Sequence, residues 1–402
     1  MAQYSFPPQK CYNTHMLNRP RLLYICFDAV PSPKGASTHV SAFVRTLVEH
    51  YDVTLLSLPP FPGFEVNLPV RHIIFPGGAE NYLDRALSFQ EFIWDHLEEE
   101  RYDFIHYRSM WAALPVAEEA KRHGTRVVCE VNGVESIELK YHYPALRARP
   151  ELMAKLRAQE EFAFSSADHI ITPSAVTAKY LGKCGVTAEK VTVIPNGVDL
   201  ELFRPPNVTK ANDPLVVLYV GTLTPWQGAE FLLDAFRRAV AVQPLQLQLL
   251  SPETNRWRAP LLKRVQRYGV GELVTFLPTA THDTAGEIIA TVDICVAPLM
   301  PTERNITQGC SPLKLFEYMA CARAIVAADL PVTREILCHE ETALLYKPNK
   351  TSHLVEPLLR LAGDHELRAN LGDAARRTVE ERFTWARAGE ELLCIYREKL
   401  PV

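Results

Sequence analysis

The sequence lacks several features that would assign it to a specialised class of protein. No apolar run reaches the ~18 residues needed to cross a bilayer, and residues 1–21 contain no apolar core of the kind that a secretory signal has. No collagen-like period or low-complexity repeat is visible along the 402 residues. The net charge of −4 provides no overall positive field for nucleic acid or anionic lipid, although a local basic patch is still possible. We therefore expect a globular, cytoplasmic protein that does not bind nucleic acid.

Paired cysteines of the CxxC type are also missing. The nine cysteines are an odd number, and Cys26, Cys129 and Cys295 lie in apolar runs, where a thiol behaves as a small hydrophobic side chain. This pattern predicts reduced thiols, with neither a disulfide framework nor a zinc site.

What the sequence does contain is a regular alternation of short apolar runs and helix-period segments. Such alternation is typical of parallel sheets that are covered by helices on both faces. The strands expected in the first half are residues 21–27, 52–57, 104–107, 126–131 and 169–172. Those expected in the second half are residues 214–220, 245–250, 274–277, 293–297 and 324–327.

A proline-rich polar stretch, residues 205–214, separates the two series and suits a linker. The sequence therefore predicts an α/β protein with two Rossmann-like parallel-sheet domains that face each other across a cleft. We place the domains at residues 1–205 and 206–384. Residues 385–402 carry apolar side chains at helical spacing, and this predicts a helix that packs back toward the first domain.

The segment of residues 308–320 is the most informative one. Ser311 is a good N-cap and Pro312 fits the first helical position, so a helix is expected to start there. This helix is apolar nearly all round and is therefore expected to be buried, yet Lys314 and Glu317 share one of its faces. They either form an intrahelical ion pair or belong to a ligand site. In a ligand site, Lys314 and the helix N-terminus suit a phosphate, and Glu317 suits the hydroxyl groups of a sugar.

Several segments, in this order, resemble glycosyltransferase family 4, whose members are retaining enzymes of the GT-B fold. They are residues 23–26 with Gly35 to His39, Val193-Ile-Pro-Asn-Gly-Val-Asp199, Leu218-Tyr-Val-Gly-Thr-Leu223 with residues 226–228, and residues 311–320 with 324–327. The resemblance covers nearly the whole chain. It implies that a sugar moves from a nucleotide-sugar donor, held by the second domain, to an acceptor hydroxyl at the first. It also implies that no metal is required, in agreement with the absence of a DxD motif from a suitable loop.

The resemblance also implies a set of site residues. Glu317 matches the glutamate that contacts the nucleotide ribose, and Lys314 and Asn132 are the candidate catalytic residues. The donor-binding candidates are Gly221, Thr222, Gln227, Gly228, Gly309, Ser311, Leu313 and Glu317. The candidates for an acceptor or diphosphate loop are Gly35 and His39, although a solvent-exposed position at the helix start is the alternative for His39.

The chain departs from the family pattern at four of these positions. Gly309 stands where the first of two glutamates is usual, Thr222 and Gln227 stand where an Arg and a Lys usually hold the diphosphate, and Asn132 replaces a histidine. Lys314 is the obvious compensating cation, and Arg304 is a second. The departures keep a second hypothesis open, a non-catalytic nucleotide-sugar binder that is the partner of another transferase.

Acceptor identity is less constrained by the sequence. A lipid-linked glycan or a small molecule would both fit. The stretch from Lys140 to Arg157 is basic and aromatic, and it is interpreted either as a solvated helix face or as a surface for anionic lipid at the inner face of the membrane.

Overall fold

The computed structural model describes residues 19–65, 68–77, 81–206, 212–252 and 256–400. The predicted absence of a secretory signal concerns residues that lie almost wholly outside these ranges, and residues 207–211 of the predicted linker lie outside them as well.

The first domain contains a seven-stranded sheet in the order β3-β2-β1-β4-β5-β6-β7. All neighbouring strands pair in parallel. The strands are β1 (Arg21–Ala29), β2 (Asp52–Leu58), β3 (Arg71–Ile74), β4 (Phe104–Tyr107), β5 (Arg126–Glu130), β6 (His169–Thr172) and β7 (Val191–Val193). The helices are α1 (Gly35–Leu47), α2 (Tyr82–Glu99), α3 (Ala113–His123), α4 (Glu135–His142), α5 (Pro150–Ser166) and α6 (Ala175–Lys183).

The second domain repeats this architecture with six parallel strands in the order β10-β9-β8-β11-β12-β13. Its strands are β8 (Leu215–Val220), β9 (Leu245–Leu250), β10 (Val274–Leu277), β11 (Ile294–Ala297), β12 (Ala324–Ala328) and β13 (Leu344–Tyr346). Its helices are α7 (Ala229–Ala239), α8 (Arg258–Tyr268), α9 (His282–Thr291), α10 (Leu313–Ala320), α11 (Pro331–Arg334), α12 (Ser352–Gly363) and α13 (His365–Arg382).

Each sheet is buried on both faces because successive side chains of a strand point to opposite sides. In β1, Leu22 and Tyr24 pack into one core with α1, while Leu23 and Ile25 pack into the other core with α2 and α3. This explains why the strands read as continuous apolar runs.

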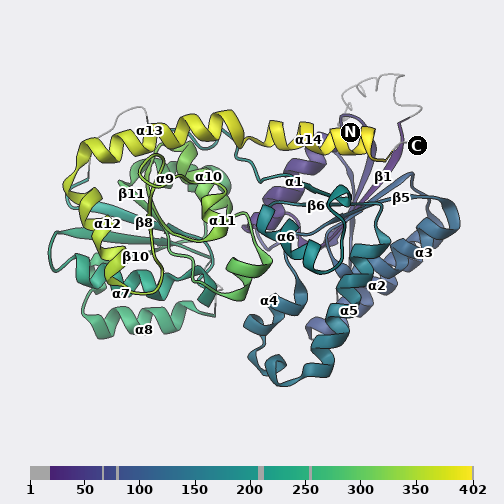
Figure 1. Cartoon of the computed structure of the whole chain (residues 1–402), viewed down its shortest axis with the longest axis horizontal. Coiled ribbons are helices and arrows are strands. Elements are labelled where there is room, and N and C mark those ends of the chain that lie inside the picture. The colour runs from purple at the N-terminus through teal and green to yellow at the C-terminus, as the bar shows by residue number, and fades with distance from the viewer. Residues whose placement is uncertain (1–18, 66–67, 78–80, 207–211, 253–255, 401–402) are drawn as a thin grey trace, which may run out of the picture.

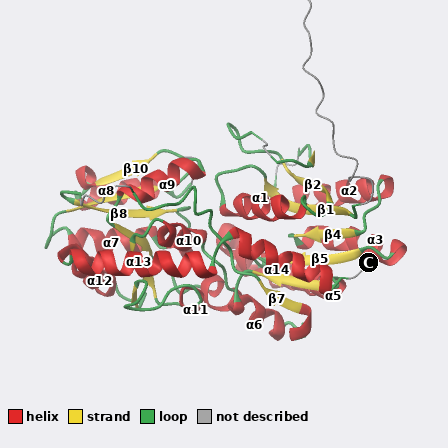
Figure 2. Cartoon of the chain, turned by 90° about the horizontal axis from the view of Figure 1, so that it is seen from above, coloured by secondary structure: helices red, strands yellow, loops and turns green. Residues whose placement is uncertain are grey.

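The last helix, α14 (Trp385–Glu398), returns to the first domain. Figure 1 shows α13 lying along the second domain and α14 along the first, and Figure 2 shows α14 over the first sheet. Leu392, Leu393 and Tyr396 are buried in the same core as α1 and Leu22. The chain thus crosses between the domains a second time, after the linker.

All ten predicted strands are present with their ends shifted by at most two residues. The sequence missed β3, β7 and β13, which have three or four residues each and are too short to show a period. Helix α1 begins at Gly35, where the Lys34 carbonyl accepts hydrogen bonds from the Ser37 and Thr38 amides.

Candidate active site

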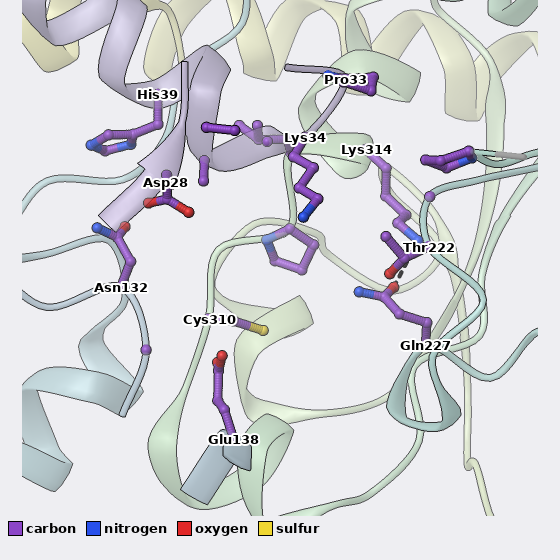
Figure 3. A pocket seen from close by; sticks show the side chains of 18 of the residues that line it. Asp28, Pro33, Lys34, His39, Asn132, Glu138, Thr222, Gln227, Cys310 and Lys314 are labelled. Atoms are coloured by element: carbon purple, nitrogen blue, oxygen red, sulfur yellow. Dashed lines mark hydrogen bonds between the residues drawn. The ribbon is translucent and has the colours of Figure 1, made fainter. Parts of the chain in front are cut away.

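A cavity of about 860 Å³ lies between the two domains (Figure 3). Its walls are formed by the segments that follow β1, β4 and β5 in the first domain and β8, β9 and β10 in the second. The strand order of each sheet reverses beside β1 or β8, and ligands of open parallel sheets bind at such points.

The cavity brings together most of the side chains that the sequence singled out. Its lining includes Gly35, His39, Asn132, Gly221, Thr222, Gln227, Ser311, Leu313, Lys314 and Glu317. Two of the predicted donor-binding residues, Gly228 and Gly309, do not line the cavity.

Lys314 is a buried cation whose ammonium has a neutral partner. Its Nζ donates a 2.9 Å hydrogen bond to Gln227 Oε1 and lies 4.3 Å from the centre of the Tyr219 ring. Burial lowers the pKa of Lys314 to about 7, against the opposing effect of Glu317. A Cβ atom at Gly221 would lie 2.9 Å from this ammonium, so glycine gives it room. The site is therefore prepared for an anion beside Lys314.

Glu317 faces a histidine rather than Lys314. Its carboxylate lies 4.0 Å from His282 Nδ1, and His282 Nε2 is hydrogen-bonded to Thr38 Oγ1 of the first domain. Burial raises the pKa of Glu317, while His282 and Lys314 oppose the shift. Of the two alternatives that the sequence left open, the intrahelical ion pair does not form among the described residues, because Lys314 and Glu317 have separate partners.

The start of α10 differs from the prediction. The N-cap is Pro312, and its extended backbone leads into Leu313 as the first helical residue. Ser311 does not cap the helix: its buried Oγ has no hydrogen-bond partner among the described residues. Its carbonyl oxygen instead accepts a 2.8 Å bond from Asn196 Nδ2 of the first domain. This contact fixes the start of α10 against the opposite domain.

Gly309 faces the first domain rather than the donor side of the cavity. A Cβ atom there would lie 2.7 Å from the Thr177 amide nitrogen and 3.0 Å from Ser174 Oγ, both at the start of α6. Its φ of +87° also disfavours any other residue. The packing of the two domains thus explains why no glutamate stands here.

Behind the first-domain side chains that line the cavity, Glu130 is the centre of a buried polar network. Its carboxylate accepts from Tyr24 at 2.6 Å and from His106 Nε2 at 3.0 Å, and it pairs with Arg108 at 3.1 Å and with His39 at 2.8 Å. Burial alone would raise its pKa, but Arg108 and the two histidines hold it well below its usual range. Glu130 is therefore a permanent anion that positions its neighbours.

This network reaches both the C-terminal helix and the second domain. His106 donates a hydrogen bond from Nε2 to Glu130, so its Nδ1 accepts from the Tyr396 hydroxyl of α14 at 2.8 Å. On the other side, His39 Nδ1 lies 2.6 Å from Asn196 Oδ1, and the amide of Asn196 bonds to Ser311. The expectation of a solvent-exposed His39 is wrong, because these contacts leave the residue only 3% exposed.

Asn132 takes its orientation from the same carboxylate. Its Nδ2 donates to Glu130 Oε1, so its Oδ1 is left to accept a hydrogen bond from a ligand. This predicts that Asn132 accepts a hydrogen bond from a donor group of the ligand, such as a sugar hydroxyl.

Arg304 is not the second free cation that the sequence suggested. It opens the short π-helical segment Arg304–Gln308, and its Nε donates to Glu138 Oε1 of the first domain at 2.9 Å. The same oxygen accepts from Gln308 Nε2 at 2.8 Å. The charge of Arg304 is therefore matched by a carboxylate and holds the domains together.

Two family models match the chain, one in each domain. The model described as "Glycosyltransferase Family 4" matches residues 33–202, and "Glycosyl transferases group 1" matches residues 214–364. The chain belongs to glycosyltransferase family 4. Its two parallel-sheet domains form the GT-B fold.

Known relatives are similar but distant. A D-inositol 3-phosphate glycosyltransferase from Jonesia denitrificans is 26% identical over 264 residues, which are 61% of this chain and 60% of the relative. The chain thus matches about three fifths of that protein's length. Sucrose-phosphate synthase from Thermosynechococcus elongatus has the same fold, with a TM-score of 0.79, 20% identity and coverage of 94% of this chain and 98% of that chain. The HepE protein of Anabaena, solved in complex with UDP-glucose, gives a TM-score of 0.70 at 16% identity, with coverage of 93% and 98%.

The family pattern did not reveal several side chains that line the cavity. They are Asp28, Lys34, Arg85, Glu135, Glu138, Ser251 and His282. In this set, burial raises the pKa of Glu135 to about 8, while a hydrogen bond with Tyr82 opposes the shift. Lys34 immediately precedes Gly35, which the sequence did predict, and this position was the sign in the sequence that Lys34 could line the site.

The described residues contain no group of three or more His, Cys, Asp or Glu side chains that could hold a metal ion. Within the same ranges, no helix combines the length and the apolar character needed to cross a membrane.

Proposed function

We propose that this protein transfers a sugar from a nucleotide-sugar donor to an acceptor hydroxyl, with retention of anomeric configuration. Membership of the family supports the class of reaction.

The observation that carries the proposal is the position of Lys314. A buried ammonium beside a neutral amide, in the first turn of α10, is an incomplete charge arrangement. The free N–H groups and the dipole of a helix start attract an anion at the same place. A diphosphate bound there would complete the arrangement, and Glu317, one turn further along, would accept hydrogen bonds from the ribose.

For the donor, we propose a uridine nucleotide as the first to test, because the similar fold of HepE was solved with UDP-glucose. For the acceptor, we propose a small phosphorylated polyol or sugar. The printed names of the inositol 3-phosphate enzyme and of sucrose-phosphate synthase favour this class, and Arg85 and Lys34 are cations on the first-domain wall.

In the proposed reaction the bond between the anomeric carbon and the β-phosphate oxygen breaks, and its electron pair stays on the phosphate. The acceptor oxygen bonds to the anomeric carbon on the same face, and its proton leaves on the nucleoside diphosphate. Negative charge therefore grows on the phosphate, where Lys314 stabilises the transition state more than the ground state. In this mechanism, cationic side chains and amide groups provide the stabilisation, and no metal is needed. Asn132 would accept a hydrogen bond from a hydroxyl of one of the sugars.

A second candidate is a non-catalytic nucleotide-sugar binder. The uncharged side chains of Thr222 and Gln227 favour it, because they take the places of the two usual diphosphate-binding cations. Incubation with UDP-, GDP- and ADP-sugars, with inositol phosphates, hexose phosphates or glycans as acceptors, separates the candidates. Acceptor-dependent release of nucleoside diphosphate supports the transferase. Calorimetric binding without release on any pair of substrates supports the binder.

We also propose peripheral contact with the inner face of the membrane for a cytoplasmic form of the protein. Arg147, Arg149, Lys155 and Arg157 are all exposed, in the first turns of α5 and in the segment before it. Sedimentation with vesicles containing anionic lipid is expected at low salt and should weaken as salt rises. Equal sedimentation with neutral vesicles would contradict this part of the proposal.

A further inference from the structure

The cationic side chains around the cavity differ in the partners that they contact within the protein. Arg85 lies over the Phe27 ring, Arg108 is paired with Glu130, Arg304 is paired with Glu138, and Lys314 is hydrogen-bonded to Gln227. Lys34 lines the same cavity, is exposed, and forms no ion pair within the described ranges. Figure 3 shows its side chain reaching into the cavity from the first domain, while Lys314 enters from the second.

The backbone of Lys34 is held in place although its side chain is exposed. Lys34 is the N-cap residue of α1, and its carbonyl oxygen accepts from the Ser37 amide at 3.0 Å. The preceding loop is fixed by a 2.9 Å bond from the Ser32 amide to Ser37 Oγ. The ammonium is therefore a point charge on a flexible stem that starts from a fixed position.

This position adjoins the start of α10. A Cβ atom at Gly35 would lie 2.8 Å from Leu313 Cδ1, so the two helix starts meet at the cavity. Lys34 precedes one of these helices and Lys314 lies in the first turn of the other. Two cations and the starts of two helices, one from each domain, thus line the same cavity.

We propose that Lys34 binds the diphosphate of the donor from the first domain and that, together with Lys314, it supplies the positive charge missing at Thr222 and Gln227. The inference rests on the proposed function. Burial lowers the pKa of Lys314 to about 7. In the empty site, this residue alone is therefore only partly protonated at neutral pH. Lys34 comes from the domain that does not hold the nucleotide. Its contact therefore requires both domains around the donor, and it affects the transfer step more than the first binding of nucleotide.

The test compares wild type with Lys34→Ala, Lys34→Arg and a control, Lys183→Ala, which removes an exposed lysine outside the cavity lining. Calorimetry measures the affinities for UDP, GDP and ADP and for the corresponding monophosphates. Steady-state release of nucleoside diphosphate measures turnover. For Lys34→Ala we expect roughly 3- to 10-fold weaker binding of the preferred diphosphate, a loss of less than about twofold for its monophosphate, and roughly 10- to 100-fold lower kcat, below the ~10²–10³ of a fully buried donor. Lys34→Arg should recover part of the loss, and Lys183→Ala should match wild type.

The outcomes separate the two proposals. Unchanged diphosphate affinity and turnover in Lys34→Ala, with an active wild type, would overturn the role of Lys34 and leave the transferase standing. An inactive wild type whose diphosphate affinity still depends on Lys34 would overturn the transferase and support the contact. A wild type that binds none of these nucleotides would overturn both.

Discussion

The ammonium of Lys314, in the first turn of α10, and the amide oxygen of Gln227, before α7, lie 2.9 Å apart although the two residues are 87 positions apart in the chain. The sequence shows both residues but not their contact. Gln227 carries no charge of its own, but its amide oxygen holds the ammonium of Lys314 in place. It also leaves a buried positive charge without a carboxylate partner, and the first prediction follows from this.

Nucleotide binding should take up a proton above pH 7. Burial lowers the pKa of Lys314 to about 7 in the empty site, and a bound diphosphate favours the charged form and raises that pKa again. Affinity should therefore fall as pH rises from 7, by up to about tenfold per unit. Calorimetry at pH 8 in two buffers of different ionisation enthalpy measures the uptake. Lys314→Met is the control and should abolish it; equal heats in both buffers for wild type would contradict the prediction.

The same residue should lower the stability of the empty protein. The folded-state pKa of about 7 lies below the ordinary value of 10.5, so the unfolded chain binds more protons between these values and stability rises with pH. The penalty for burying the charged form is fully present below pH 7. Lys314→Met should then be more stable than wild type at pH 6, by roughly 1–4 kcal/mol, and the difference should shrink toward pH 10. Urea unfolding at both pH values measures this, and a variant less stable than wild type at pH 6 contradicts it.

Glu317 should recognise the ribose. Hydrogen bonds to a carboxylate contribute roughly 1.5–3 kcal/mol, so Glu317→Ala should weaken nucleotide binding by about tenfold or more. Deoxy nucleotides are the matched control: removing a ribose hydroxyl should weaken binding to wild type but not to the variant. If the hydroxyl matters equally to both proteins, Glu317 serves only His282.

A glutamate at position 309 should not restore the usual family contact. A Cβ atom there meets the start of α6, and φ is +87°. With a ψ of 165°, this backbone conformation is essentially restricted to glycine and opposes other residues by roughly 1–3 kcal/mol. Gly309→Ala and Gly309→Glu should both lower the unfolding temperature and leave turnover no higher than that of wild type. A stable Gly309→Glu protein with raised turnover would show that the side chain reaches the donor.

The sequence predicted the two sheets and the apolar strands, because these depend on local periodicity, and most of the site residues that its short motifs singled out line the cavity. It did not predict relationships between distant segments. His39 looked like a solvent-exposed residue at a helix start, and it is buried because Glu130 and Asn196 come from other parts of the first domain. Position 309 matched a donor motif, but the packing of the opposite domain determines its role. Tyr396 contacts His106 across 290 residues, and helical spacing alone could not reveal this partner.

The central claim is that Lys314 stabilises the leaving diphosphate in a sugar transfer. Steady-state nucleotide release, measured with the best donor and acceptor for wild type and Lys314→Ala, tests it most directly. The account predicts an active wild type and a loss of roughly 10²–10³ in kcat for the variant, with a smaller loss in nucleotide affinity. A variant within a few-fold of wild type would contradict the role of Lys314, and a wild type that releases no nucleotide with any donor and acceptor would contradict sugar transfer itself.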